Sequence, residues 1–339
     1  MIEIVKALLE KGFAYETDDG IYFSVEKFPE YGKLSGINLD EQKSGARVEV
    51  NEQKRHPADF ALWKKAPANH IMQWDSPWGM GFPGWHIECT AMSKKFLGET
   101  FDIHTGGIDH IPIHHENEIA QSEAWLGHRC VNYWMHGEFL LVDNGKMSKS
   151  LGNTYTISDL IEKGYSPLAY RYFCLNGNYR NKLNFTWEAL DAAKVSLDRL
   201  YEALAKHKAA GAQPLPEGTA EEWKKEFTEA VSDDLNVPLG LGILWKALRF
   251  PVKSREIYDF ALFTDQILGL SMEENAEKPV QNDGTQEAEL SPEIRELVNQ
   301  RTEAKKKKDF KTADEIRDRL KTMGVTLIDT KEGVRIVTE

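Results

Sequence analysis

Two strand-like stretches with a helix between them constrain the fold of this chain more than any other feature. The residues Phe101–His104 and Val131–His136 are rich in apolar and aromatic side chains and have the length of buried strands. A strand, a helix and a second strand in this order predict a βαβ unit with parallel strands. We therefore expect an α/β fold, and 339 residues leave room for two or three domains.

The N-terminal residues predict a helix followed by a hairpin. An amphipathic helix is expected from Ile4 to Lys11. The run Asp18-Asp19-Gly20 is a typical hairpin turn between two apolar strands. A second hairpin turn is expected at Asn144-Gly145.

From about residue 154 the chain is predicted to be helical. Ser166 followed by Pro167 is typical of a helix start, because proline fits the first helical position. We expect further helices over 187–208 and 221–270, a linker over 209–218, a disordered acidic segment over 271–290, a capped helix from Ser291, and two short strands from Val325 with a turn at 331–333.

Composition excludes several classes of protein. No apolar run approaches the length of a membrane span, so we expect no membrane association. The three cysteines are far apart and odd in number, which favours a reducing cytoplasm over a disulfide framework. A net charge of −12 argues against non-specific coating of nucleic acid, although a localised basic surface stays compatible with it.

Residues 145–153, Gly-Lys-Met-Ser-Lys-Ser-Leu-Gly-Asn, form a glycine-flanked basic loop. The residues Lys146, Met147, Ser148, Lys149 and Ser150 spell KMSKS. Two ammonium groups on a mobile loop suit the stabilisation of phosphate charge as it moves during adenylyl transfer from ATP. The alternative is a solvated basic turn without a catalytic role.

Cys89, His114 and Glu118 form a candidate zinc-binding set. His114 and Glu118 are four residues apart, so both would project from one face of a helix. A thiolate, an imidazole and a carboxylate are all zinc ligands, and structural sites usually need four. The alternative is that Cys89 is a small buried hydrophobic residue and that the histidine only caps the helix.

The run Gly79-Met-Gly81-Phe-Pro-Gly84 matches a dinucleotide-binding pattern, but its context does not fit. Such a site needs a strand directly before the first glycine, whereas Trp74–Trp78 is turn-like. We interpret the run as a glycine-rich loop that leads into a helix over Trp85–Phe96.

Several long motifs together resemble the bacterial cysteinyl-tRNA synthetase family over nearly the whole chain. KMSKS is the second nucleotide motif of class I aminoacyl-tRNA synthetases. The other matching stretches are Tyr31–Ser35, Asp59–Lys64, Trp74–Gly79, Gly84–Cys89, His114–Gln121, Asp233–Asn236 and Ala313–Asp318.

The resemblance implies a fold, an activity and roles for particular residues. It implies part of a class I Rossmann-type catalytic domain with the zinc site over 1–153, a helical bundle over 154–270, an acidic flexible linker over 271–290, and a small α+β anticodon-recognition domain over 291–339. The activity would be ATP-dependent activation of cysteine and its transfer to tRNA(Cys), with one Zn²⁺ per chain as cofactor and ATP with Mg²⁺ as substrate. Zinc would be held by Cys89, His114 and Glu118, Lys149 would contact ATP, and Trp85 and His104 would line the cysteine pocket.

The chain also departs from the family pattern. The family begins with a zinc-binding cysteine and a HIGH motif that binds ATP, and neither precedes Cys89 here. We therefore expect an N-terminally truncated synthetase that lacks on the order of 100 residues. The fourth zinc ligand would be missing, and the chain alone would be inactive or poorly active. A monomer is expected, completed by a separate N-terminal polypeptide if the enzyme is split.

Three alternatives remain open. The chain could be a non-catalytic tRNA-binding fragment, or one half of a split enzyme. It also resembles, less closely, the ligase that joins cysteine to an amino-sugar inositol in mycothiol synthesis, which lacks a C-terminal tRNA-reading region. The basic residues Lys305–Lys308, Lys311, Arg317, Arg319 and Lys321 are expected to face tRNA, or to form a solvated helix face paired with neighbouring acids.

Overall fold

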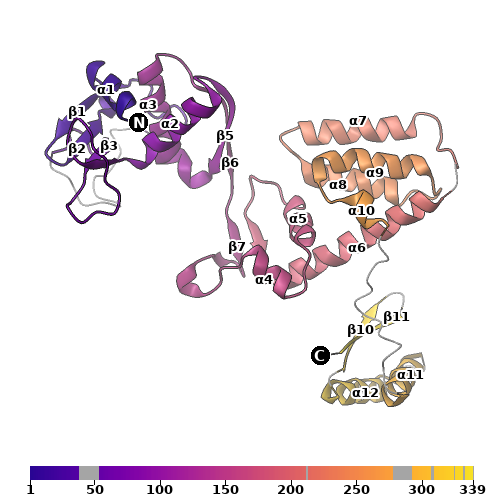
Figure 1. The fold of residues 1–339 in the computed structure, drawn as a ribbon. Coiled ribbons are helices and arrows are strands. Elements are labelled where there is room, and N and C mark those ends of the chain that lie inside the picture. Colours follow the sequence, from indigo (N-terminus) through magenta and orange to yellow (C-terminus); the bar gives the residue numbers. More distant parts are fainter. Residues whose placement is uncertain are drawn as a thin grey trace. The chain divides into compact units, whose positions relative to one another are not determined.

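The computed structural model describes residues 1–37, 53–210, 213–277, 292–306, 309–323, 325–330 and 333–338 (Figure 1). Its contacts divide the chain into two compact units. The first comprises residues 1–194 with 231–238, and the second comprises 195–230 with 239–339. Residues 154–194 therefore belong with the N-terminal unit, and the finer domain limits given above stay predictions. None of the described helices is long and apolar enough to cross a membrane.

The first unit begins with an antiparallel sheet of strand order β1-β2-β3-β4. The predicted hairpin is confirmed, because Thr17 pairs with Gly20 across the turn. A Cβ on Gly84, directly after β4, would lie 1.9 Å from the Ala61 carbonyl oxygen on β3. The last glycine of the run at 79–84 thus permits a close approach between backbones. The elements are α1 (Ile2–Glu10), β1 (Ala14–Thr17), β2 (Gly20–Phe23), β3 (Phe60–Lys65) and β4 (Gly81–Pro83).

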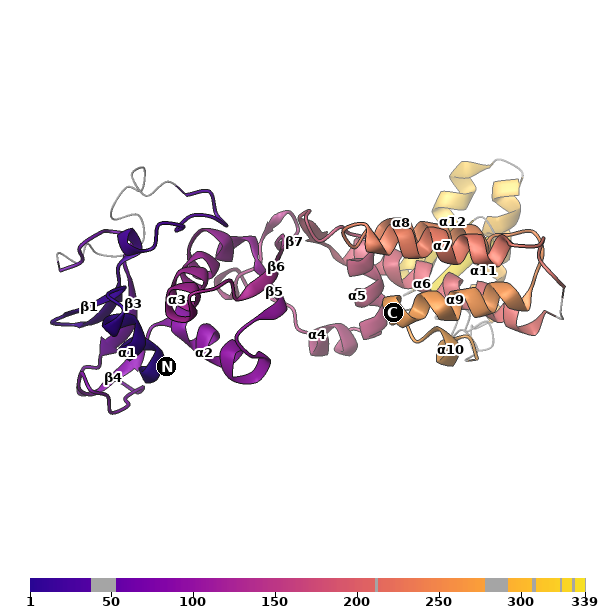
Figure 2. The same cartoon turned by 90° about the horizontal axis from the view of Figure 1, so that it is seen from above.

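The predicted βαβ unit is confirmed. Strands β5 and β6 are parallel, with His104 opposite Trp134 and Ile103 opposite Tyr133. Between β5 and the helix α3 the chain makes a short 3-10 turn and then a π-helical turn, Ile111–His115. Figure 2 shows α2 and α3 near these strands. The elements are α2 (Trp85–Leu97), β5 (Phe101–Gly107), α3 (Glu116–Leu126) and β6 (Val131–Gly137).

Helix α3 is fixed at its start by a buried carboxylate. Glu116, its first residue, is fully buried. Its oxygens accept backbone N–H groups from Gly32 at 2.9 Å, Leu34 at 3.1 Å and Ser35 at 2.8 Å. The segment 32–35 is therefore tied to the helix that carries Glu118, and the position of that side chain depends on this anchor.

We expect Glu116→Ala to lower the free energy of unfolding of the first unit by about 3 kcal/mol or more. A hydrogen bond to a charged group contributes about 1.5–3 kcal/mol, and three N–H donors would lose their acceptor. The exposed control Glu3→Ala should change the free energy by less than about 0.5 kcal/mol. Urea unfolding followed by near-ultraviolet circular dichroism measures both. Equal midpoints for the two variants would contradict this role of Glu116.

A small sheet of order β8-β7-β9 follows the βαβ unit. The hairpin turn lies one residue earlier than predicted, because Asp143 and Asn144 have positive φ angles of 49° and 61° and Gly145 begins β8. Aspartate and asparagine tolerate this conformation better than other non-glycine residues. The expectation of helix throughout from 154 was wrong at β9, which pairs in parallel with β7. The elements are β7 (Leu140–Val142), β8 (Gly145–Lys146), α4 (Ile157–Glu162), α5 (Pro167–Leu175, capped by Ser166 as predicted) and β9 (Leu183–Phe185).

The predicted helices over 187–270 are confirmed, but the acidic segment after them was partly mispredicted. Met272 is fully buried, and the Asp265 carboxylate accepts its backbone N–H at 2.8 Å. This anchor orders residues 271–277, and the rest of the segment, 278–290, lies outside the described residues. The elements are α6 (Trp187–Ala209), α7 (Thr219–Ser232), α8 (Val237–Leu248), α9 (Arg255–Leu268) and α10 (Met272–Asn275).

The C-terminal residues form two helices and an antiparallel strand pair around Leu297, Leu320 and Val325. The two predicted strands are confirmed. Ser291 of the predicted cap and Lys331–Glu332 of the predicted turn lie outside the described residues. The elements are α11 (Pro292–Lys306), α12 (Phe310–Thr322), β10 (Val325–Thr330) and β11 (Gly333–Thr338).

Candidate metal and nucleotide sites

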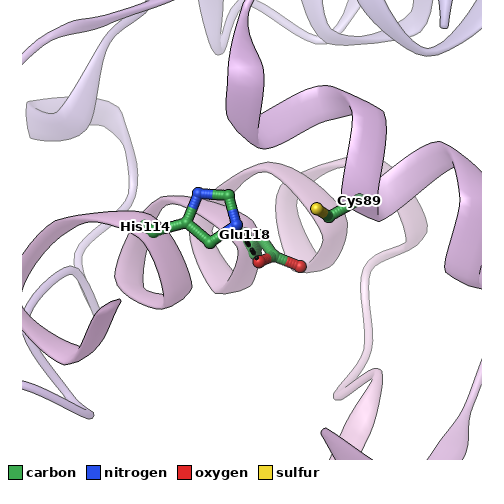
Figure 3. Close-up of side chains that lie close together, drawn as sticks. All are labelled: Cys89, His114 and Glu118. Carbon is green, nitrogen blue, oxygen red and sulfur yellow. Dashed lines mark ion pairs between the residues drawn. The ribbon is translucent and has the colours of Figure 1, made fainter. Parts of the chain in front are cut away.

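The structure brings Cys89, His114 and Glu118 together from three elements. Cys89 lies on α2, His114 on the π-helical turn and Glu118 in the first turn of α3 (Figure 3). Their ligand atoms all lie within 4.8 Å of one another. His114 Nε2 lies 2.9 Å from Glu118 Oε1. This convergence agrees with the predicted set, while its role as a metal site stays a prediction.

Burial and neighbouring charges shift the pKa values of two side chains in this cluster. Glu118 is only 4% exposed. Burial alone would raise the pKa of Glu118, but His104 and His114 outweigh it and lower the pKa to about 2. Burial, with the nearby carboxylates of Glu118 and Glu88, raises the pKa of the Cys89 thiol to about 11. The thiol is therefore protonated near neutral pH, and a cation placed among the three groups would favour its thiolate.

One oxygen of Glu118 has no hydrogen-bond partner among the described residues. Oε1 is buried, and its nearest polar neighbour given by the structure is His114 Nε2, an ion-pair contact at 2.9 Å. A buried carboxylate oxygen without such a partner is costly, and a bound cation is one common way to satisfy it. The donor set of sulfur, nitrogen and oxygen fits zinc, so the residues present fit the metal that the family resemblance implies.

Trp85 and His104 lie beside the same cluster. The centroid of the Trp85 ring is 4.2 Å from that of His114, and Trp85 is 59% exposed. His104 Nε2 lies 3.3 Å from Glu118 Oε2. Both residues predicted to line the cysteine pocket are thus in contact with candidate zinc ligands, although what they bind stays a prediction.

Sequence reasoning missed several imidazoles in this region. His86 Nδ1 lies 2.8 Å from His114 Nδ1, and His115 Nδ1 lies 2.7 Å from His136 Nε2. The pKa of His86 is lowered to about 4, first by burial and then by His114. The clustering of histidines between residues 104 and 136 in the sequence was the available signal, but only the parallel pairing of β5 and β6 brings His136 to the group.

The KMSKS loop belongs to the β7–β8–β9 sheet, which is distinct from the β5–β6 sheet. Asn153 forms two hydrogen bonds across the loop. The Ser148 N–H donates to Asn153 Oδ1 at 2.8 Å, and Asn153 Nδ2 donates to the Lys146 carbonyl oxygen at 3.0 Å. The hydroxyls of Ser148 and Ser150 lie 2.7 Å apart. Lys146 and Lys149 are exposed, and Met147 is half-buried. The two ammonium groups are therefore accessible to an anion.

We expect Asn153→Ala to loosen this loop. It removes two hydrogen bonds of about 1 kcal/mol each, which should raise the open fraction roughly 5- to 30-fold. Trypsin should then cleave after Lys146 and Lys149 faster by a similar factor, measured by mass spectrometry under native conditions. Asn132→Ala, which removes a surface hydrogen bond on β6, is the matched control. Equal cleavage rates in the two variants would show that Asn153 does not hold the loop.

The C-terminal basic residues are partly paired. Arg317 Nη1 lies 2.8 Å from Asp314 Oδ1, and Arg319 Nη2 lies 3.0 Å from Glu293 Oε1. These pairs match the alternative of a solvated helix face for two of the predicted cations. Lys307 and Lys308 lie outside the described residues, and a tRNA-facing surface here stays a prediction.

Comparison with known proteins identifies relatives over most of the chain. Residues 1–195 match the model of the class I (C) tRNA synthetase catalytic domain, and residues 287–336 match that of the cysteinyl-tRNA ligase anticodon-binding domain. The cysteine–tRNA ligase of Treponema denticola is 42% identical over 352 residues, covering 97% of this chain and 71% of the relative. The cysteine–tRNA ligase of Thermococcus onnurineus is 45% identical, covering 98% of this chain and 73% of the relative. The cysteine–tRNA ligase of Thermus thermophilus is 44% identical, covering 99% of this chain and 72% of the relative.

Proposed function

The chain belongs to the cysteine–tRNA ligase family, and from this premise we propose that it takes part in activating cysteine with ATP and joining it to tRNA(Cys). The observation that carries the proposal is the convergence of Cys89, His114 and Glu118 within 4.8 Å, inside a domain of this family. A catalytic and an anticodon-binding domain in one chain disfavour the amino-sugar ligase, which lacks the second.

We propose that Cys89, His114 and Glu118 hold a zinc ion. When bound, zinc supplies a soft Lewis acid that prefers a thiolate to a hydroxyl, and cysteine and serine differ by that one atom. The three side chains would leave part of a tetrahedral shell open for a further ligand. Trp85 and His104 would close the amino-acid pocket around it, since both contact the zinc-binding residues.

We assign the phosphate chemistry to the KMSKS loop. The cysteine carboxylate attacks the α-phosphate of ATP, and negative charge builds on the departing pyrophosphate. Lys146 and Lys149 are exposed cations that can neutralise this charge. The two Asn153 hydrogen bonds hold the loop in a defined conformation. ATP would be used with Mg²⁺, tRNA would be the second substrate, and we propose a cytoplasmic monomer.

One observation favours a split enzyme as the second candidate. Ile103 and Tyr133 are opposite each other on β5 and β6, and they are 55% and 68% exposed. Parallel sheets are normally covered on both faces, so this apolar face suits a further α/β segment. Such a segment could be provided by a separate polypeptide. The chain alone would then be a poor enzyme.

Cysteine-dependent ATP–pyrophosphate exchange tests the proposal. The 339-residue chain is assayed alone and together with the part of the Thermus thermophilus relative that it does not cover. We expect exchange with cysteine and not with serine, strongest in the combined sample. Exchange in neither sample, with both polypeptides folded and zinc present, would contradict the proposed function and favour a non-catalytic tRNA-binding protein.

A further inference from the structure

Two successive residues in the turn between α7 and α8 have a strained backbone. Asp234 and Leu235 have positive φ angles of 52° and 54°. Aspartate tolerates this conformation, whereas a bulky residue such as leucine is rarely found in it. The Leu235 side chain is 48% exposed, so its burial does little to stabilise the turn. Strain of this kind persists only where surrounding contacts fix the backbone, and the contacts of Asp234 are therefore informative.

The Asp234 carboxylate binds two neighbouring side chains from the segment before β9. The Tyr179 hydroxyl donates to Asp234 Oδ1 at 2.6 Å. Arg180 donates from Nη2 to Oδ1 at 3.0 Å and from Nε to Oδ2 at 2.5 Å. Exposed ion pairs are commonly weak, but a two-point pair between arginine and a carboxylate is stronger and fixes geometry. Arg180 and then Tyr179 lower the pKa of Asp234 to about 2, so the carboxylate is charged near neutral pH. We call these three residues the Asp234 clamp.

The segment that Asp234 binds is also tied to β7. The Glu138 N–H donates to the Tyr179 carbonyl oxygen at 2.8 Å. Three residues after Arg180, the Leu183 N–H donates to the Phe139 carbonyl oxygen at 3.2 Å and begins β9. All of these residues, and Asp234 with them, belong to the first compact unit. The clamp therefore fixes the point at which the chain enters β9.

Strand β9 in turn holds the hairpin turn from which the KMSKS loop extends. The Asp143 N–H donates to the Phe185 carbonyl oxygen at 3.0 Å. The Asn144 N–H donates to Asn184 Oδ1 at 2.7 Å. The next two residues form β8, which ends at Lys146, the first residue of the loop. A displacement of β9 would therefore displace the base of the loop.

We propose that Asp234 is a positioning residue for the KMSKS loop. The Asp234 clamp fixes the segment before β9, β9 fixes the turn before β8, and the loop extends from β8. Asp234 acts on the loop only through these contacts and is not itself a ligand of ATP. The inference rests on the proposed function only for what the loop does in the reaction, because the conformation of the loop can be measured without turnover.

Trypsin cleavage of Asp234→Asn under native conditions tests this inference. Asparagine keeps the size of the side chain and tolerates a positive φ, but its amide group faces Arg180 as donor against donor. We expect cleavage after Lys146 and Lys149 to be about fivefold faster than in the unchanged chain. Asp259→Asn, which removes an exposed pair with Arg255 on α9, is the matched control and should leave this rate unchanged. Equal rates in the two variants, with both folded by circular dichroism, would overturn the proposal.

Arg180→Gln provides a second variant, because it removes the other partner of the pair. The double variant Asp234→Asn, Arg180→Gln should be cleaved no faster than either single variant, and effects that multiply would overturn the pairing. In ATP–pyrophosphate exchange with the combined sample, Asp234→Asn should lower the maximal rate about fivefold and keep KM for cysteine within about twofold. A raised KM for cysteine at an unchanged maximal rate would overturn the positioning role. Absence of exchange in the unchanged sample would contradict the proposed function alone, and the cleavage rates would still decide this inference.

Discussion

The double variant Cys89→Ser, His114→Ala is expected to lose the zinc that the unchanged chain retains through dialysis. It removes the soft ligand and the imidazole, and leaves only Glu118 of the proposed set. Loss of an outer partner of a metal ligand costs about 10- to 100-fold in affinity, and direct ligands contribute more. We therefore expect the affinity of the double variant for zinc to be lower than that of the unchanged chain by more than about 100-fold. Zinc content measured by mass spectrometry after dialysis tests this.

Cys174→Ser is the matched control for this measurement. Cys174 is a half-buried thiol on α5, outside the candidate zinc-binding set. The control should retain as much zinc as the unchanged chain. Equal zinc content in the double variant and in the control, with both folded, would contradict the assignment of Cys89 and His114 as ligands.

Lys149→Ala is expected to lower cysteine-dependent ATP–pyrophosphate exchange by about 100-fold or more. Removing one group that stabilises developing transition-state charge typically costs about 100- to 1,000-fold in rate. Lys149 is exposed, and no ion pair joins it to a carboxylate among the described residues, so its charge is available to pyrophosphate. The assay uses the combined sample described above, and every variant is compared with the unchanged chain in that same sample.

Lys182→Ala is the control, because Lys182 is an exposed cation just before β9 in the same small sheet. Its exchange rate should stay within about twofold of the unchanged sample, as expected for a surface substitution away from a site. The exchange rate is measured as a function of ATP concentration. Lys149→Ala should lower the maximal rate at saturating ATP, and Lys182→Ala should leave it within about twofold. A rate for Lys149→Ala equal to that of Lys182→Ala would show that the KMSKS loop has no catalytic role.

Local signals in the sequence were sufficient for the elements that position the site. Asp18-Asp19-Gly20 predicted the first hairpin because its turn chemistry is local. The apolar stretches at 101–104 and 131–136 predicted the parallel pair β5 and β6 because two strand-length apolar runs with a helix between them are typical of a βαβ unit. His114 and Glu118 were placed on one face because four residues make about one helical turn.

Non-local contacts explain what the sequence could not show. β9 is a short strand, Leu183–Phe185, and it forms through pairing with β7, which lies far earlier in the chain. Met272 was assigned to a disordered segment because its neighbours are acidic, yet Asp265 and burial fix it. His115 and His136 meet because β5 and β6 are adjacent, so the spacing of these two histidines in the sequence did not predict their contact.

Calorimetric titration of the zinc-loaded chain with cysteine and with serine tests the central claim most directly. This measurement needs no catalytic turnover, so it can be made on the 339-residue chain by itself. If Cys89, His114 and Glu118 hold a zinc ion that selects a thiolate, cysteine should bind and serine should not. The cysteine signal should disappear in the Cys89→Ser, His114→Ala variant and after metal removal. Equal binding of cysteine and serine, or cysteine binding that persists without zinc, would contradict the account.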